Sequence, residues 1–168
     1  TLISAEPDLP YQRPPLSKAF LKDPAHDLLP LRPESFYTKN SVTLRLGVEV
    51  AAIDRGAMAV RLSDGMSLPF DRLALATGAR PRVPPIEGIG LDGVFYLRHA
   101  DDARLLRSRL HAAGDVVVVG GGIIGLEIAA TARLLGKTVT VLEAADRLMG
   151  RVVAPEISSH GLSLHRGW

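Results

Sequence analysis

One stretch limits the fold more than any other, a glycine-rich turn between an apolar strand and a helix. Four valines at 116–119 predict a buried strand, residues 120–125 form the turn, and residues 123–135 predict a helix that Gly136 ends. Residues 137–143 then predict a second strand. A strand, a helix and a strand in this order form a βαβ unit, which predicts an α/β fold with a parallel sheet.

The turn has the spacing G-x-G-x-x-G, which suits a pyrophosphate group. Gly120 allows the sharp turn, Gly122 lets the backbone approach a phosphate, and Gly125 lets the helix pack closely on the strand. Glu143, which closes the second strand, can accept hydrogen bonds from both ribose hydroxyls of NADH and would repel a 2′-phosphate. NADH is therefore expected to be preferred over NADPH, but Arg147 follows closely and could serve that phosphate, so the strictness of the preference stays open. Ordinary turns and a solvated acid are the plainer alternatives.

The first half of the chain predicts a strand, two short helices and then several short strands. Residues 1–6 predict a strand that ends on Glu6, and four prolines between positions 7 and 15 exclude regular structure there. The predicted helices span residues 16–22 and 33–39. Short apolar runs follow, with Asp64-Gly65 as a turn, at 42–44, 48–53, 58–62 and 73–75.

Two further segments complete the predicted organisation. Residues 78–90 are rich in Pro and Gly and are interpreted as a crossing between domains. Residues 101–113 predict an amphipathic helix that Asp101 or Asp102 caps. Near the C-terminal end, residues 160–164 depart from the helical pattern expected after residues 154–158.

Composition excludes several classes of function. The arginines are spread along the chain, the formal charge is only +2, and aromatic residues are few, which argues against nucleic-acid binding. Cysteine is absent, so this segment holds no disulfide, thiolate metal ligand or cysteine redox couple. No apolar run is long enough to span a membrane, and the opening residues lack a signal-peptide pattern, so the predicted location is the cytoplasm. The histidines show no metal-ligand spacing, and no metal site is predicted at His26, His99, His111, His160 or His165.

Three segments resemble a known family. They are Pro10–Lys18 (PYQRPPLSK), Leu75–Arg82 (LATGARPR) and the end of the glycine turn, Gly125-Leu126-Glu127. They are similar to the ferredoxin reductase branch of the FAD-dependent pyridine nucleotide-disulfide oxidoreductases, which includes rubredoxin and putidaredoxin reductases. The resemblance runs from the first residue to about Ser158. It implies two nested Rossmann-like domains, both incomplete, with a partial FAD-binding domain over residues 1–82 and a partial NAD-binding domain over residues 83–168.

The resemblance also implies roles for single residues. Lys18 is expected beside the flavin ring, paired with Glu127, where its ammonium group would stabilise the negative charge of reduced flavin. Glu6 is expected on the ribose of the FAD adenosine, with Arg13 as a weaker candidate for contacting FAD. A surface lysine without a role is the alternative for Lys18. Other expected FAD contacts are the backbone of Val50, the segment Ala76-Thr77-Gly78, Arg98, and Ile123 as an aliphatic shield of the flavin.

The implied function is a reductase that takes hydride from NADH onto FAD and passes electrons to a ferredoxin or a rubredoxin. Relatives carry a first glycine-rich turn for FAD and a later FAD segment that this chain lacks, so the chain is interpreted as a fragment. A disulfide reductase needs a cysteine beside the flavin, and none is present. Three alternatives stay open: the flavoprotein part of a nitrite reductase, a protein like apoptosis-inducing factor, and a dinucleotide-binding fragment without turnover.

Overall fold

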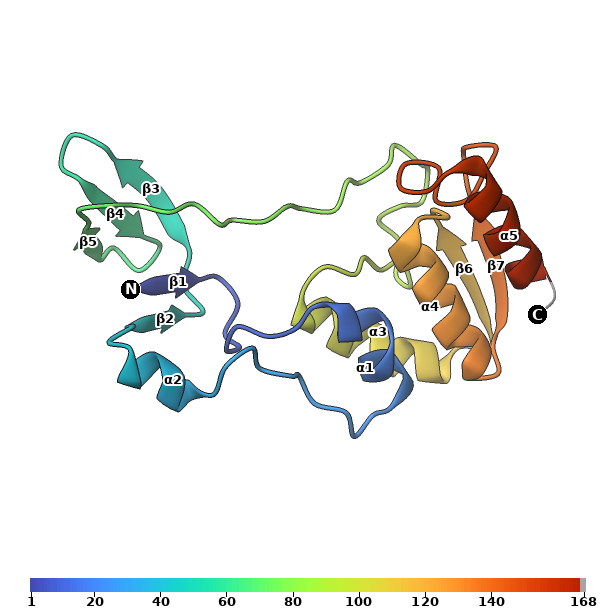
Figure 1. Cartoon of the computed structure of the whole chain (residues 1–168), viewed down its shortest axis with the longest axis horizontal. Coiled ribbons are helices and arrows are strands. Elements are labelled where there is room, and N and C mark those ends of the chain that lie inside the picture. The colour runs from blue at the N-terminus through green and yellow to red at the C-terminus, as the bar shows by residue number, and fades with distance from the viewer. Residues whose placement is uncertain (167–168) are drawn as a thin grey trace. The chain divides into compact units, whose positions relative to one another are not determined.

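The chain forms two compact units in the computed structural model, which describes residues 1–166. Residues 1–13 and 28–83 form the first unit, and residues 14–27 together with the chain from 84 onward form the second. The two units are described separately here, and their elements carry the labels of Figure 1. Gly167 and Trp168, which the predicted NAD-binding domain includes, lie outside the described residues. The assignment of residues 1–82 to FAD and 83–168 to NAD stays a prediction.

The first unit begins with a short parallel strand pair. Strand β1 (Leu2–Ser4) pairs with β2 (Leu44–Leu46), and Leu2 lies opposite Leu44. Helix α2 (Glu34–Lys39) precedes β2 and begins one residue after the predicted start, because Pro33 is its N-cap. The strand predicted over residues 1–6 therefore forms, but its paired part has only three residues.

The rest of the first unit is an antiparallel sheet in the order β3-β4-β5. Its strands are β3 (Val50–Asp54), β4 (Ala59–Leu62) and β5 (Ser67–Pro69). The turn predicted at Asp64-Gly65 joins β4 to β5, with Gly65 at a φ of +86°. Val60 and Leu62 are the buried residues of this sheet.

The strand predicted at residues 73–75 is wrong. These residues form no strand within the described chain, and Leu73 and Leu75 are 41% and 68% exposed. A strand needs a neighbouring backbone to take its hydrogen bonds, and an apolar run does not supply one. No strand of the described residues pairs with this segment.

The second unit contains the predicted βαβ motif. Strand β6 (Asp115–Val119) leads into helix α4 (Ile123–Leu134), and β7 (Thr138–Leu142) returns parallel to β6, with Val116 opposite Val139. Helix α4 lies beside this strand pair (Figure 1). Gly136, at a φ of +76°, ends the helix where the sequence predicts. The core of this unit contains buried Leu21 and Leu110, which cluster with Ala132 of α4.

Helix α3 (Ala100–Ala112) begins differently from the prediction. Its N-cap is His99, and neither Asp101 nor Asp102 occupies that position. Asp102 is the third helical residue, and its Oδ2 accepts the backbone N–H groups of Arg98 and His99, each at 2.9 Å. His99 and Asp102 together form a capping box, so Asp102 caps the helix from its third position rather than from its N-cap.

The helix predicted over residues 16–22 is split into two short elements. Pro14–Ser17 forms the 3₁₀ helix η1 and Ala19–Lys22 forms α1. Arg107 of α3 holds the chain after α1, because its guanidinium donates to the carbonyl oxygens of Phe20, Asp23 and His26 at 3.0 to 3.4 Å. The same guanidinium lies 4.2 Å from the centre of the Phe20 ring.

The predicted loss of helix at residues 160–164 is also wrong, because helix α5 spans Pro155–Arg166. The reason is close packing on the preceding loop. Ser158 is 1% exposed and its Oγ donates to the carbonyl of Leu148 at 2.5 Å. A Cβ added at Gly161 would lie 3.0 Å from Cε of Met149. A glycine inside a helix costs about 1 kcal/mol relative to alanine, and α5 continues through Gly161 despite this cost.

Candidate functional site

The glycine-rich turn leaves an open approach to the start of α4. Gly120 follows β6 at a φ of +113°, and Gly122 is the N-cap of α4. A Cβ added at Gly125 would lie 2.0 Å from the carbonyl oxygen of Gly120, so strand and helix meet with no room for a side chain. Nothing lies within 4 Å of the position that a Cβ would take at Gly122. The start of α4 is therefore open at Gly122, and the N–H groups and dipole of a helix start favour an anion such as a pyrophosphate.

Glu143 lies directly after β7 and faces this turn. Its Oε1 accepts the N–H of Ala145 at 2.8 Å, and its Oε2 accepts the N–H of Gly121 at 2.7 Å. The hydrogen bonds from Ala145 and Gly121 hold the pKa of Glu143 below its ordinary value, and the charge of Arg151 acts in the same direction. A carboxylate has about four lone-pair sites, and these backbone donors take only part of them, which leaves acceptor capacity for a ribose hydroxyl.

Arg147 binds carbonyl groups of its own loop. Its Nη1 donates to the carbonyl of Val153 at 2.8 Å, and its Nη2 donates to the carbonyl of Gly150 at 2.7 Å. The backbone N–H of Met149 in the same loop donates to the carbonyl of Gly121 at 2.9 Å. Both terminal nitrogens of the guanidinium therefore hold the loop after β7 in shape.

Lys18 and Glu127 form the predicted pair. The Nζ of Lys18 lies 2.7 Å from Oε1 of Glu127, with the two side chains 50% and 25% exposed. The hydroxyl of Ser17 donates to Oε2 of the same carboxylate at 2.5 Å. Burial raises the pKa of Glu127. The hydrogen bonds from Lys18 and Ser17 and the charge of Lys18 lower it by more than burial raises it, so the net shift is downward. The carboxylate is therefore ionised at neutral pH.

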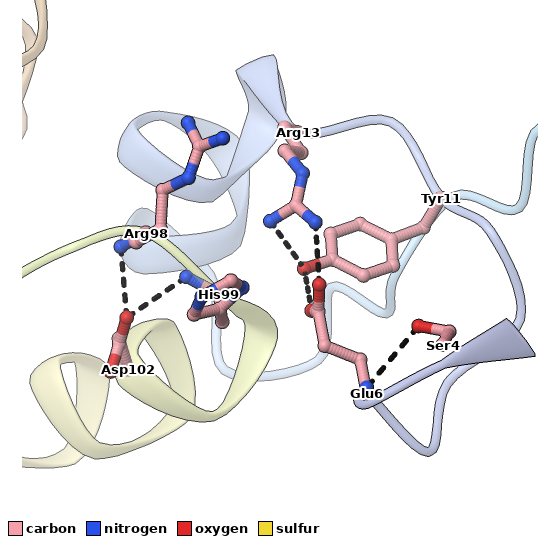
Figure 2. A network of polar contacts seen from close by, with 7 residues as sticks. All are labelled: Ser4, Glu6, Tyr11, Arg13, Arg98, His99 and Asp102. Atoms are coloured by element: carbon pink, nitrogen blue, oxygen red, sulfur yellow. Dashed lines mark hydrogen bonds and ion pairs between the residues drawn. The ribbon is translucent and has the colours of Figure 1, made fainter. Parts of the chain in front are cut away.

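In the first unit, Glu6 and Arg13 lie together with Tyr11. Figure 2 shows the Arg13 guanidinium, the Tyr11 hydroxyl and the Glu6 carboxylate meeting at one point, with Arg13 also donating to the Tyr11 hydroxyl at 3.3 Å. The Nη2 of Arg13 lies 2.5 Å from Oε1 of Glu6, and the Tyr11 hydroxyl donates to Oε2. The Arg13 guanidinium also lies 5.2 Å from the centre of the Tyr11 ring. The group places a carboxylate acceptor just after β1, which fits the expected ribose contact.

The remaining predicted residues lie at exposed or irregular positions, and their roles stay predictions. Val50 is the first residue of β3 and Ile123 the first of α4, and they are 42% and 49% exposed. The backbone N–H of Arg98 belongs to the cap of α3, as Figure 2 shows. Three more lie in an exposed segment without regular structure, namely Ala76, Thr77 and Gly78.

Sequence reasoning missed three residues that contact the predicted ones. Tyr11 contacts Glu6, while Ser17 and Thr131 contact the Lys18–Glu127 region. Ser17 precedes Lys18 in the PPLSK segment and could have been singled out there. Thr131 is the only hydroxyl residue of α4 and lies four positions after Glu127, which is a signal that helical spacing provides.

Residues 1–166 contain neither a candidate metal cluster nor a candidate membrane-spanning helix. No three His, Asp or Glu side chains gather in a way that could hold a metal ion. No helix of this range combines the length and apolar character that crossing a bilayer requires.

The turn, the acid after β7 and the parallel strand pair together define a dinucleotide-binding βαβ protein. Residues 1–166 match the family model described as pyridine nucleotide-disulphide oxidoreductase, and the chain belongs to that family. The sequence is 50% identical over 155 residues to a rubredoxin-NAD(+) reductase of Pseudomonas putida, covering 92% of this chain and 40% of that protein. It is 46% identical to the rhodocoxin reductase of Rhodococcus erythropolis, covering 98% of this chain and 39% of that protein.

Solved structures agree with this family. The crystal structure of a ferredoxin reductase from Rhodopseudomonas palustris superposes with a TM-score of 0.92 at 44% identity, covering 98% of this chain and 42% of that one. A covalent complex of putidaredoxin reductase with putidaredoxin gives a TM-score of 0.88 at 41% identity, covering 99% of this chain and 41% of that one. The α/β fold with Rossmann-like units is thereby confirmed, with partial sheets. The chain spans about two fifths of the length of the relatives it matches.

Proposed function

We propose that this chain carries the NADH site and part of the FAD site of a reductase that delivers electrons to a ferredoxin or a rubredoxin. The relatives described above are named as reductases of such carriers, and this chain is up to 50% identical to them. The proposal includes a cytoplasmic location, where NADH is supplied. Because the chain matches about two fifths of each relative, the proposal concerns the activity of the whole reductase.

The observation that carries the proposal is the arrangement of the glycine turn and Glu143. The turn offers N–H groups and open space at the start of α4, which suits a pyrophosphate. The Glu143 carboxylate lies beside the same turn, 2.7 Å from the N–H of Gly121, with lone pairs left for a ribose. A nucleotide with two free ribose hydroxyls matches both features, whereas a 2′-phosphate would add negative charge beside Glu143.

The chemistry of electron transfer belongs to the cofactors. When bound, FAD accepts hydride from NADH and releases electrons one at a time to the acceptor. The residues of the chain bind and orient the cofactors and supply fixed charge. Lys18 presents a half-exposed ammonium group that would stabilise negative charge, and Glu127 balances it at 2.7 Å. Other proposed FAD contacts are Glu6, Arg13, Val50, Ala76, Thr77, Gly78, Arg98 and Ile123.

The proposal is tested by nucleotide choice. We expect NADH to bind this chain more tightly than NADPH, because a 2′-phosphate would meet the Glu143 carboxylate. Glu143→Ala should narrow the preference by about 1–3 kcal/mol, the size of one hydrogen bond to a charged group. Isothermal titration of the chain with each nucleotide measures the preference.

Asp146→Ala is a matched control, since it removes an equal charge from the same loop, three residues away. It should leave the preference near its wild-type value. A chain that prefers NADPH, or an equal effect of both substitutions, would contradict the role proposed for Glu143.

A further inference from the structure

Helix α4 holds Ser17 at two separate points. The Glu127 carboxylate accepts the Ser17 hydroxyl at 2.5 Å, and the Thr131 hydroxyl donates to the Ser17 carbonyl oxygen at 2.9 Å. Glu127 and Thr131 are four residues apart on one face of the helix. Ser17 is the last residue of η1, so both contacts act on the residue directly before Lys18.

The hydrogen bonds are specific because each hydroxyl carries a single proton. The Ser17 hydroxyl has a second acceptor in the Pro14 carbonyl, but at 3.4 Å that oxygen is much more distant than Glu127. A threonine inside a helix commonly donates to the carbonyl four residues earlier in its own helix. Thr131 donates instead across to Ser17, and both residues are only 5% exposed. Such a buried contact is costly to leave unmade.

Lys18 itself has a long and half-exposed side chain, so its position depends on the groups around it. Its ammonium group contacts Oε1 of Glu127 at 2.7 Å, while Ser17 takes the other oxygen of that carboxylate. The Ser17 hydroxyl thereby fixes how the carboxylate is turned. The Thr131 hydroxyl fixes the peptide carbonyl that joins Ser17 to Lys18.

We propose that Ser17 and Thr131 are positioning residues that hold the Lys18–Glu127 ion pair, Ser17 through the carboxylate and Thr131 through the main chain. Neither has to touch a cofactor for this role. The consequence for FAD rests on the proposed function, whereas the positioning of the ion pair can be tested without any cofactor.

The test is a pH titration of the Glu127 carboxyl carbon by ¹³C NMR in the glutamate-labelled chain. Ser17→Ala removes one of the hydrogen bonds that lower the pKa of Glu127, so the pKa should rise. Thr131→Val keeps the shape of the side chain but removes its hydroxyl, and it should also raise the pKa of Glu127 by loosening Ser17. Thr131→Ser restores the hydroxyl and should return the pKa to its wild-type value. If Thr131→Val does not fold, the Ser17→Ala result decides, because it leaves the Thr131 contact in place.

Ser158→Ala is the matched control for a purely structural effect. Ser158 is 1% exposed, and its hydroxyl donates to the Leu148 carbonyl in the same unit. This variant removes the same kind of buried hydrogen bond and should leave the pKa of Glu127 unchanged. The proposal would be overturned if Ser17→Ala left the pKa of Glu127 unchanged. It would also be overturned if Ser158→Ala raised that pKa as much as Thr131→Val does.

A second measurement separates the positioning of the ion pair from the proposed function. On the flavin-loaded reductase, Thr131→Val should lower the flavin midpoint potential and Thr131→Ser should restore it, because Lys18 would be held less firmly beside reduced flavin. A raised pKa of Glu127 with an unchanged potential would support the positioning role and refute the place of Lys18 beside the flavin.

Discussion

The two units of the molecule build parallel strand pairs of very different quality. In the second unit β6 and β7 pair over five residues, with α4 joining them and packing on them. In the first unit β1 and β2 pair over only three residues. The longest-paired strands of the first unit belong instead to a separate antiparallel sheet.

The difference matters for where each unit keeps its candidate site residues. The second unit holds its turn between paired strands and a packed helix, and Glu143 and the loop after β7 bond directly to Gly121. The first unit holds Glu6 and Arg13 in irregular chain after β1, connected through side chains. The nucleotide turn is therefore supported by a five-residue strand pair and a packed helix. The Glu6 group is supported by side-chain contacts and by isolated backbone bonds, such as the Gly47 N–H to the Glu6 carbonyl at 3.0 Å. The following predictions test this contrast.

The largest expected loss of stability and of nucleotide binding follows substitution of Gly125. Gly125→Ala places a Cβ 2.0 Å from the Gly120 carbonyl oxygen, so α4 must move away from β6. We expect the second unit to lose about 3 kcal/mol or more of unfolding free energy and to lose NADH binding. Amide exchange followed by mass spectrometry should show faster exchange in β6, α4 and β7, with β3 to β5 unchanged.

Gly114→Ala is the control for this substitution. Gly114 precedes β6 in the same unit, and nothing lies within 4 Å of the position that its Cβ would take. It should leave exchange and NADH binding close to wild type. Equal exchange throughout both units in Gly125→Ala would show that the units are not separately stable.

A smaller contrast is expected between two fully buried leucines. Leu21 is 0% exposed in the core cluster of the second unit, and Leu62 is 2% exposed in the antiparallel sheet of the first. Replacing a buried leucine by alanine lowers the unfolding free energy by about 2 to 5 kcal/mol. We expect Leu21→Ala to cost about 4 kcal/mol and Leu62→Ala about 2 kcal/mol, because Leu21 lies among more apolar neighbours. Exchange measured separately in each unit checks the order, and a reversed order would contradict it.

The smallest expected effect is the pH dependence of the Lys18–Glu127 pair. The pKa of Glu127 is lowered in the folded chain, so the unfolded state binds more protons between the folded pKa and the ordinary glutamate value. The stabilisation is complete above that ordinary value and is lost as pH falls through the folded pKa. Because Lys18 is half exposed, we expect it to amount to less than about 1 kcal/mol.

Glu127→Gln does not titrate and serves as the comparison. The difference in unfolding free energy between wild type and this variant, measured by urea denaturation, should shrink as pH falls below the ordinary glutamate value. A difference that grows on acidification would contradict the downward shift in pKa.

The βαβ motif of the second unit was largely predictable from sequence because its constraints are local. Gly120 and Gly125 are required by a turn of six residues, and Gly136 ends the helix at a position that the helical pattern defines. Glu143 follows from the end of β7 by counting. In each case the physical requirement and the residue lie within one strand–helix–strand segment.

What sequence reasoning missed depends on contacts between distant residues. Ser17 and Thr131 are 114 positions apart, and nothing in either segment specifies that they meet. The segment at 73–75 has the composition of a strand, but a strand also needs a neighbour that local sequence does not provide. Residues 160–164 depart from the helical pattern in sequence, and the packing of α5 on the preceding loop through Ser158 and Leu148 is known only from the structure.

The Arg147 guanidinium has a consequence for the thermodynamics of binding. By donating to Gly150 and Val153, it orders the loop after β7 before any nucleotide arrives. A ligand that binds a disordered loop must use part of its binding energy to restrict the conformations of that loop. Here the guanidinium already restricts that loop in the folded chain, so a nucleotide bound at the neighbouring glycine turn would not have to bear the entropy of ordering residues 147–153.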